Sequence, residues 1–221
     1  MSVIDDLLSL LAPHECLGCG AEGALLCHSC SQQLKLPPPR CYRCHRLSPN
    51  NRTCEHCRSS SHLYAVHTRT IYRGFAKDLV WRLKFTGAQS AAAEMAGLMM
   101  QLSRTAAHGV LMPVPTATQR VRSRGYDQAV LLTKQLSRLT GLPWLHGVRR
   151  ISQAHQVGAG RQQRLRQLQA AFVVSNPATV RGAHIILVDD VVTTGATLEA
   201  TAAALRSAGA QRVEAIVFAQ A

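Results

Sequence analysis

Aromatic residues, acidic residues and long apolar runs are all scarce in this chain of 221 residues. Aromatics make up 5% of the residues, but apolar residues make up 47%, which excludes a disordered chain and supplies a buried core. Apolar runs such as residues 185–188 fall far short of the roughly 18 residues that a membrane span needs. Asp5 and Asp6 stand where a secretory signal would be basic. We therefore expect a soluble, cytoplasmic protein without a membrane span.

Cysteine is absent after residue 57, and all eight cysteines fall in four C-x-x-C pairs. The pairs are Cys16/Cys19, Cys27/Cys30, Cys41/Cys44 and Cys54/Cys57. A C-x-x-C turn directs two thiolates at one point, and two such turns complete a tetrahedral zinc site. We therefore predict two structural zinc ions in preference to disulfides or a redox pair. The spacing leaves open whether the first pair shares its metal with the second pair or with the third.

Two short segments divide the chain. Residues 36–40 read Leu-Pro-Pro-Pro-Arg and form a stiff spacer between the two cysteine halves. Three serines at residues 59–61 follow the last cysteine pair and indicate a boundary. We expect a double zinc-ribbon module at residues 1–62 and a second domain at residues 63–221. So small a module has little core of its own, so metal binding would supply its folding energy.

Strand-like and helix-like segments alternate in the second domain. The predicted strands are residues 65–72, 110–114, 172–174, 185–188 and 213–218. The predicted helices are residues 76–85, 91–104, 127–139 and 197–207. This alternation predicts an α/β fold with a mostly parallel sheet that helices cover on both faces. Ligands of such sheets bind at the carboxyl ends of the strands.

The segment 185–197 carries the strongest functional signal. An apolar strand leads to the adjacent carboxylates Asp189 and Asp190, and a loop of small residues then opens a helix. Backbone N–H groups and threonine hydroxyls at a helix start suit a phosphate, and Gly195 lets the backbone approach it. The carboxylates can bind a ribose diol or help to hold Mg²⁺. The predicted sugar-phosphate site comprises Asp189, Asp190, Val191, Thr193, Thr194, Gly195, Ala196 and Thr197.

This segment resembles the phosphoribosyl-pyrophosphate (PRPP) motif of type I phosphoribosyltransferases. The whole chain is similar to the ComF family, which joins a double zinc ribbon to such a domain. The resemblance implies that Asp189 and Asp190 meet the ribose hydroxyls of PRPP and act as the catalytic pair if the domain is active. It implies that residues 193–197 cradle the 5-phosphate and that Mg²⁺ accompanies PRPP.

A second part of the resemblance lies in residues 113–128. Pro113-Val114-Pro115 is followed by Arg120, Arg122, Arg124, Gly125, Tyr126, Asp127 and Gln128. The arginines suit a diphosphate, because a guanidinium binds phosphate oxygens in pairs. By resemblance this segment is the mobile loop near pyrophosphate. Asp127 replaces the expected asparagine, and its carboxylate would weaken anion binding or pair with an arginine.

Two further segments match the family less completely. Leu83-Lys84-Phe85 resembles a Leu-Lys-aromatic element, which makes Lys84 a candidate phosphate contact. Gln156, Arg164 and Phe172 match another element, but Gln167 stands where asparagine is expected. These departures weaken the case for catalysis more than the case for ligand binding.

The positive charge is concentrated in one stretch. The chain carries a net +13, and residues 120–166 hold ten Lys/Arg against the single Asp127. Of the 25 cationic residues, 21 are arginine, whose rigid fork matches phosphate oxygens. The stretch predicts a phosphate-facing surface. Its only aromatics are Tyr126 and Trp144, so the sequence does not support a stacking-rich groove for single strands.

Two hypotheses of function follow. In the first, which the resemblance implies, the chain binds PRPP or a related ligand and handles incoming single-stranded DNA during natural transformation, beside proteins of the competence machinery. In the second, it transfers phosphoribosyl from PRPP to a nucleobase or another nitrogen acceptor, while Mg²⁺ and arginines stabilise the departing diphosphate. The sequence contains no identifiable nucleobase pocket, which favours the first hypothesis.

Overall fold

The computed structural model describes residues 14–103, 109–151 and 171–221. Its elements are α2 (His28–Ser31), η1 (Pro49–Asn51), α3 (Glu55–Arg58), β1 (Val66–Ile71), α4 (Phe75–Phe85), α5 (Ala88–Ser103), β2 (Val110–Pro113), α6 (Thr118–Arg124), α7 (Gln128–Thr140), β3 (Val148–Arg150), β4 (Phe172–Val174), η3 (Pro177–Thr179), β5 (His184–Val192), α9 (Ala196–Ser207) and β6 (Arg212–Gln220). The candidate residues Gln156, Arg164 and Gln167 lie outside the described residues. None of the described helices is both long enough and apolar enough to cross a membrane.

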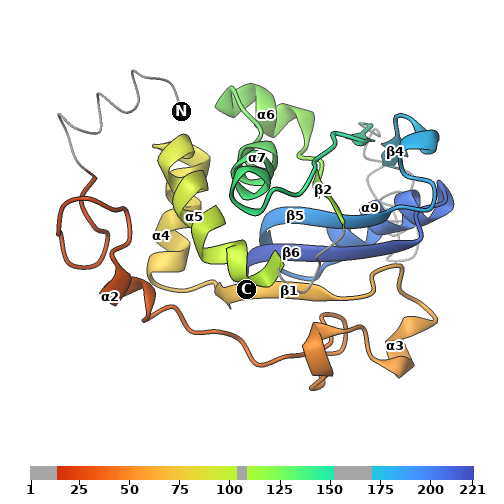
Figure 1. Cartoon of the computed structure of the whole chain (residues 1–221), viewed down its shortest axis with the longest axis horizontal. Helices are drawn as coiled ribbons and strands as arrows, with labels where there is room; N and C mark the ends of the chain where they lie inside the picture. Colours follow the sequence, from red (N-terminus) through yellow and green to blue (C-terminus); the bar gives the residue numbers. More distant parts are fainter. Residues whose placement is uncertain (1–13, 104–108, 152–170) are drawn as a thin grey trace, which may run out of the picture.

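Four parallel strands in the order β1-β6-β5-β2 form the central sheet (Figure 1). Ile186 and Val188 of β5 pack into the apolar cluster that contains α4, α5 and α7. Ile185 and Leu187 pack into the opposite cluster, with α9. The run at residues 185–188 is apolar throughout because both of its faces are buried. The predicted α/β fold, with a parallel sheet covered on both faces, is confirmed.

Strand β5 extends beyond the predicted end at residue 188. Its pairing with β6 continues to Val192, which lies opposite Gln220. Val191 and Val192 are β-branched residues that favour extended backbone. Asp189 and Asp190 therefore lie within β5, near its carboxyl end, whereas we expected them to follow the strand.

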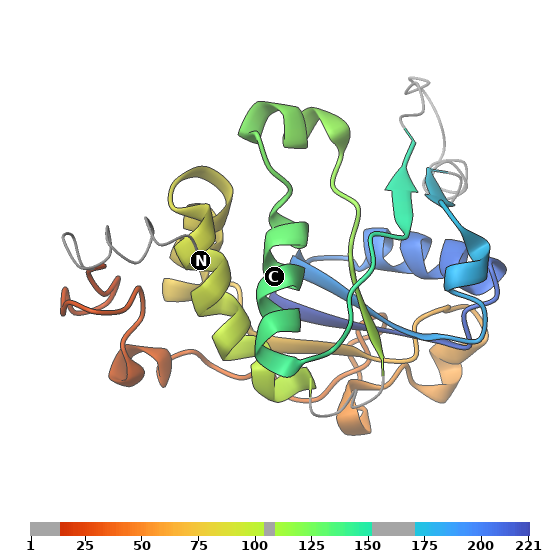
Figure 2. The ribbon, with the colours of Figure 1, turned by 45° about the horizontal axis from the view of Figure 1, so that its top comes forward.

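Two other segments differ from the expectations. Residues 118–124 form helix α6, whereas the family resemblance implied a loop there. Figure 2 shows α6 joined by extended segments to β2 and α7, beyond the carboxyl end of β2. Strand β4 was expected, but it pairs antiparallel with β3 in a separate two-stranded sheet.

The cysteine-rich region forms two lobes that contact different parts of the second domain (Figure 1). The first lobe, residues 14–34, places Leu25, Leu26 and Leu34 in the apolar cluster of α4 and α5. The second lobe, residues 40–61, places Tyr42 in the cluster that contains α9. Each lobe therefore shares a core with the second domain, which compensates for its small apolar content. The boundary that we predicted at residue 62 falls in the connection between α3 and β1.

Candidate functional site

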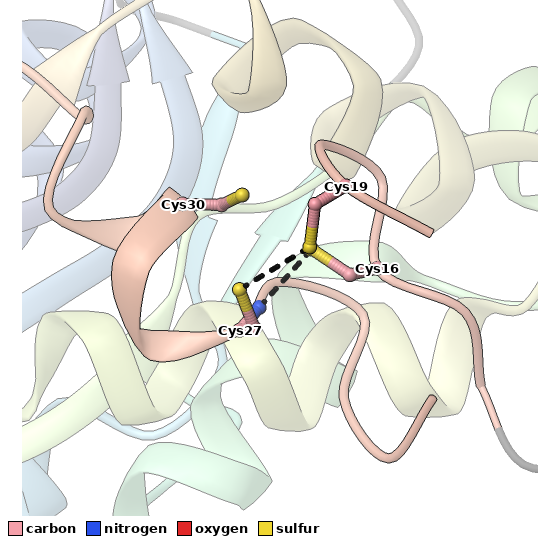
Figure 3. Close-up of side chains that lie close together, drawn as sticks. All are labelled: Cys16, Cys19, Cys27 and Cys30. Atoms are coloured by element: carbon pink, nitrogen blue, oxygen red, sulfur yellow. Dashed lines mark hydrogen bonds between the residues drawn. The ribbon is translucent and has the colours of Figure 1, made fainter. Parts of the chain in front are cut away.

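The eight cysteines gather into two groups of four sulfur atoms. Cys16, Cys19, Cys27 and Cys30 form the first group (Figure 3), and Cys41, Cys44, Cys54 and Cys57 form the second. The Sγ–Sγ distance is 3.7 Å for Cys19 and Cys27 and 3.6 Å for Cys44 and Cys54. A tetrahedral zinc ion with Zn–S bonds of about 2.3 Å holds its sulfurs about 3.8 Å apart, whereas a disulfide brings them to about 2.05 Å. The clusters fit two structural zinc sites, and consecutive pairs share each site.

Within each cluster the thiols differ in how readily they ionise. The backbone N–H of Cys27 donates to Cys16 Sγ at 3.3 Å, and this bond is the main reason that the pKa of Cys16 falls to about 6. At Cys41 burial opposes ionisation, but backbone N–H groups lower its pKa to about 6. Burial and the neighbouring thiols raise the pKa of Cys30 and of Cys57 to about 12. Neighbouring thiolates in a cluster repel one another, and a divalent cation would relieve this repulsion by neutralising their charge.

Asp190 and Lys84 meet at the carboxyl edge of the parallel sheet. Asp190 is 4% exposed, and Lys84 Nζ, from the last turn of α4, lies 2.5 Å from Asp190 Oδ2. Because consecutive strand side chains point to opposite faces, Asp190 faces α4 and Asp189 faces away from it. The fold thus brings the predicted Lys84 to the predicted carboxylates, although the two segments are far apart in the sequence.

Asp189 is the carboxylate that resists ionisation. Its Oδ1 accepts the backbone N–H of Asp190 at 2.9 Å. Burial first, and then the neighbouring Asp190 carboxylate, raise the pKa of Asp189 well above its usual range, while Lys84 opposes this shift. The side chain keeps some contact with solvent. Two carboxylates in this environment suit a ligand that brings a cation or donates hydroxyl hydrogen bonds.

The connection from β5 to α9 brings a left-handed glycine and two threonines to the start of a helix. Gly195 is the N-cap residue of α9 and adopts a left-handed conformation with φ 72°. Thr193 and Thr194 are exposed, and Thr194 Oγ1 lies 3.4 Å from the backbone nitrogen of Ala196. The first N–H groups of the 12-residue α9 begin at this turn, where the helix dipole favours negative charge.

Tyr42 of the second zinc lobe packs directly against this turn. A Cβ atom on Gly195 would lie 2.8 Å and 2.9 Å from two carbons of the Tyr42 ring. The Tyr42 hydroxyl donates to Glu199 Oε2 in the first turn of α9. Glu199 also accepts from Ser61 Oγ at 2.9 Å and from the His62 backbone N–H at 2.7 Å. Burial opposes ionisation of Glu199, but these donors lower its pKa, and the carboxylate joins the zinc lobe to α9.

Helix α6 is held at the end of α4. The Arg124 guanidinium lies 5.5 Å from the centroid of the Phe85 ring, and the Tyr126 hydroxyl donates to the Leu83 carbonyl at 2.8 Å. Arg124 is thereby placed near the Lys84 end of α4. Arg120 lies on the exposed side of α6.

Asp127 serves as the N-cap residue of α7. Its Oδ1 accepts the backbone N–H groups of Ala129 and Val130, at 2.9 Å and 3.4 Å, and the Thr116 hydroxyl at 3.0 Å. Among the described residues no arginine pairs with this carboxylate. The aspartate that replaces the expected asparagine therefore has a capping function that either residue can perform.

Known proteins share both parts of the chain. Residues 7–58 match the double zinc ribbon domain, and residues 121–221 match the phosphoribosyl transferase domain. The competence protein ComFC of Bacillus subtilis is 30% identical over 83% of this chain and 79% of its own length. Competence protein F of Haemophilus influenzae is 29% identical over 86% and 87%. The DNA utilization protein YhgH of Salmonella typhimurium is 35% identical, but over 62% of this chain and only 63% of its own length.

Similarity to solved structures is more distant. The glutamine PRPP amidotransferase from B. subtilis aligns with 58% of this chain and 26% of its own, at 20% identity and a TM-score of 0.42.

Proposed function

We propose a function for this chain, which belongs to the ComF family: the turn between β5 and α9 binds PRPP or a related phosphoribosyl ligand. The observation that carries this proposal is the meeting of Lys84 with Asp190 beside that turn, at the carboxyl edge of the sheet. Parallel α/β sheets bind their ligands at this edge. The contact between the partly buried Lys84 and the buried Asp190 supplies one cation for phosphate and one anion for hydroxyl groups or a metal ion.

Each part of the ligand has a chemical counterpart in the site. Residues 193–197 would receive the 5-phosphate, because N–H groups and threonine hydroxyls gather there. Asp189 and Asp190 would accept hydrogen bonds from the ribose hydroxyls, and Lys84 and Arg124 would supply positive charge for the diphosphate.

Mg²⁺ fits the same donor set. It binds through one or two carboxylates together with substrate phosphates, and it would neutralise diphosphate charge here. Binding of a cation near Asp189 would favour the ionised form of this residue, whose pKa is raised in the folded chain.

Calorimetric titration with PRPP and Mg²⁺ tests the site. We expect Asp189→Asn combined with Asp190→Asn to abolish binding. The two carboxylates that would bind the ribose hydroxyls and the cation lose their charge in this variant. Asp78→Asn is the matched control, since Asp78 is an exposed carboxylate on α4. Unchanged PRPP affinity in the double variant would refute the assignment.

We further propose that the chain handles single-stranded DNA in natural transformation, with the phosphoribosyl ligand as a bound regulator. The names of its relatives, competence protein and DNA utilization protein, support this role. Arginine contacts to phosphates give affinity that falls as salt rises. Changing Arg120, Arg122 and Arg124 to alanine should therefore flatten the salt dependence of oligonucleotide binding. An unaltered slope would show that α6 is not part of the DNA-binding surface.

The alternative proposal is an active phosphoribosyltransferase, which the match of residues 121–221 to the transferase domain favours. A nitrogen acceptor would form a bond to ribose C1 as the bond from C1 to pyrophosphate breaks, and the acceptor would lose a proton. Incubation of the protein with PRPP, Mg²⁺ and a panel of nucleobases tests this activity. Release of pyrophosphate that depends on a base would establish the enzyme, and its absence with every base would favour the binding role.

A further inference from the structure

Helix α4 presents two aromatic side chains to solvent. Trp81 is 53% exposed and Phe85 is 60% exposed, although the opposite face of α4 buries Leu79 and Leu83 completely. The centroids of the two rings are 5.8 Å apart, with an angle of 44° between the planes. Among the described residues these are the two aromatics with large exposed surfaces. Since each ring could bury about 150–250 Å², such exposure indicates a surface that is covered by a ligand.

Basic residues outnumber acidic residues on the two helices that meet at this aromatic pair. The Arg124 guanidinium lies 5.5 Å from the centroid of the Phe85 ring, so the basic helix α6 adjoins the pair. Lys84 is paired with Asp190, but helix α4 also carries Lys77 and Arg82 against the single acidic residue Asp78, and α6 carries three arginines and no acidic residue. The surroundings therefore favour a polyanion over a neutral or basic protein partner.

We propose that Trp81 and Phe85 are a stacking platform for the bases of single-stranded DNA, whose phosphates lie against the arginines of α6. Stacking on a side chain requires an open base face, which a single strand offers and a duplex keeps within its own base stack. Arg124 would bind a phosphate of the DNA strand beside the Phe85 ring. The proposal rests on the DNA-handling role above and adds the surface and the form of DNA that it recognises.

This surface depends on the fold. The basic stretch at residues 120–166 has few aromatics, and α4 lies far from it in the sequence. The hydrogen bond from the Tyr126 hydroxyl to the Leu83 carbonyl, at 2.8 Å, brings the two segments together. Stacking partners and phosphate partners thus come from separate helices.

Tryptophan fluorescence tests the platform directly. The chain has two tryptophans, so the variant Trp144→Phe leaves Trp81 as the sole tryptophan. Titration with a short oligo(dT) should quench this emission as the bases stack, whereas the matching duplex should not. In the same background, Phe85→Leu should weaken oligo(dT) binding by roughly 5- to 150-fold, the effect of losing one stacked base.

Anisotropy of a labelled oligonucleotide extends the test to Trp81 in the otherwise unchanged full chain. We expect Trp81→Leu to weaken binding over the same range and Trp81→Phe to retain most of it, because leucine keeps the apolar surface but lacks the aromatic face. Leu36→Ala is the control for an exposed apolar residue far from α4, since Leu36 is 65% exposed. PRPP affinity should be the same in the Trp81 variants and in Leu36→Ala.

The outcomes separate this inference from the function on which it rests. If the unaltered chain binds no single-stranded DNA, both the DNA role and the platform are wrong. If it binds the strand and the leucine variants bind equally well, only the platform is wrong. Loss of self-association in those variants, with oligo(dT) affinity unchanged, would instead assign Trp81 and Phe85 to a protein interface.

Discussion

Substitution of Gly195 tests how closely the second lobe supports the turn between β5 and α9, which we propose to bind phosphate. In Gly195→Ala the new Cβ would lie 2.8 Å and 2.9 Å from the Tyr42 ring, so that one of the two must move. The backbone there has φ 72°, which costs an alanine about 1–2 kcal/mol. Displacing a packed ring adds about 1–3 kcal/mol. We therefore expect a loss of about 2–5 kcal/mol in the free energy of unfolding.

The chain offers a closely matched control for this substitution. Gly141, which ends α7, has φ 72° and ψ 0°, against φ 72° and ψ 4° at Gly195, and a Cβ there would meet nothing within 4 Å. Gly141→Ala should therefore show the backbone cost alone. Urea unfolding in zinc-replete buffer gives both values, and calorimetry should show weaker PRPP binding only for Gly195→Ala.

A double-mutant cycle with Tyr42→Ala isolates the contact. Removing the ring should relieve the collision, so the cost of Gly195→Ala should fall to that of Gly141→Ala in this background. Equal losses for the two glycine variants in the unaltered chain, or additive effects of Gly195→Ala and Tyr42→Ala, would refute the reasoning.

Substitutions at three other residues give separate checks. Glu199→Gln should lower the free energy of unfolding by about 1.5–3 kcal/mol at neutral pH, because it weakens charged hydrogen bonds. Since the folded pKa of Glu199 is lowered, the difference from the unaltered chain should shrink as the pH falls through that pKa. Urea unfolding at several pH values measures this difference. Asp127→Ala should cost about 1 kcal/mol as the cap of α7 is lost, and Asp127→Asn should cost little in the same assay; equal costs would contradict the capping role. Asp189→Asn should stabilise the chain at neutral pH, because the folded pKa of Asp189 is raised; this gain should vanish in acid, where the carboxyl is protonated in both states, and a loss of stability at neutral pH would contradict it.

Local patterns predicted most of the sheet and the metal ligands. The apolar run at residues 185–188 identified the central strand because burial on both faces leaves a continuous signal. The cysteine pairs identified two four-ligand sites, but only the fold showed that consecutive pairs combine. The end of β5 was missed because its last residues are held by pairing with β6, a partner that the local sequence does not reveal.

The contacts between distant segments could not be predicted from sequence patterns. Tyr42 lies inside a C-x-x-C turn, which explains its position but gives no sign of its contact with Gly195 and Glu199. Phe85 was identified only as the aromatic residue of the Leu-Lys-aromatic element, and the fold alone placed Arg124 beside its ring. Asp127 was interpreted through its charge, whereas its place before a helix was the informative feature.

The most direct measurement of the central claim is a calorimetric titration of the full chain with PRPP, with and without Mg²⁺. The site formed by Lys84, Asp190 and the turn at residues 193–197 predicts saturable binding at one site per chain, strengthened by Mg²⁺. It also predicts competition by ribose 5-phosphate, which shares the phosphate and the ribose hydroxyls. Absence of binding heat under both conditions, confirmed by an equilibrium method, would contradict the claim that this edge of the sheet binds a phosphoribosyl ligand.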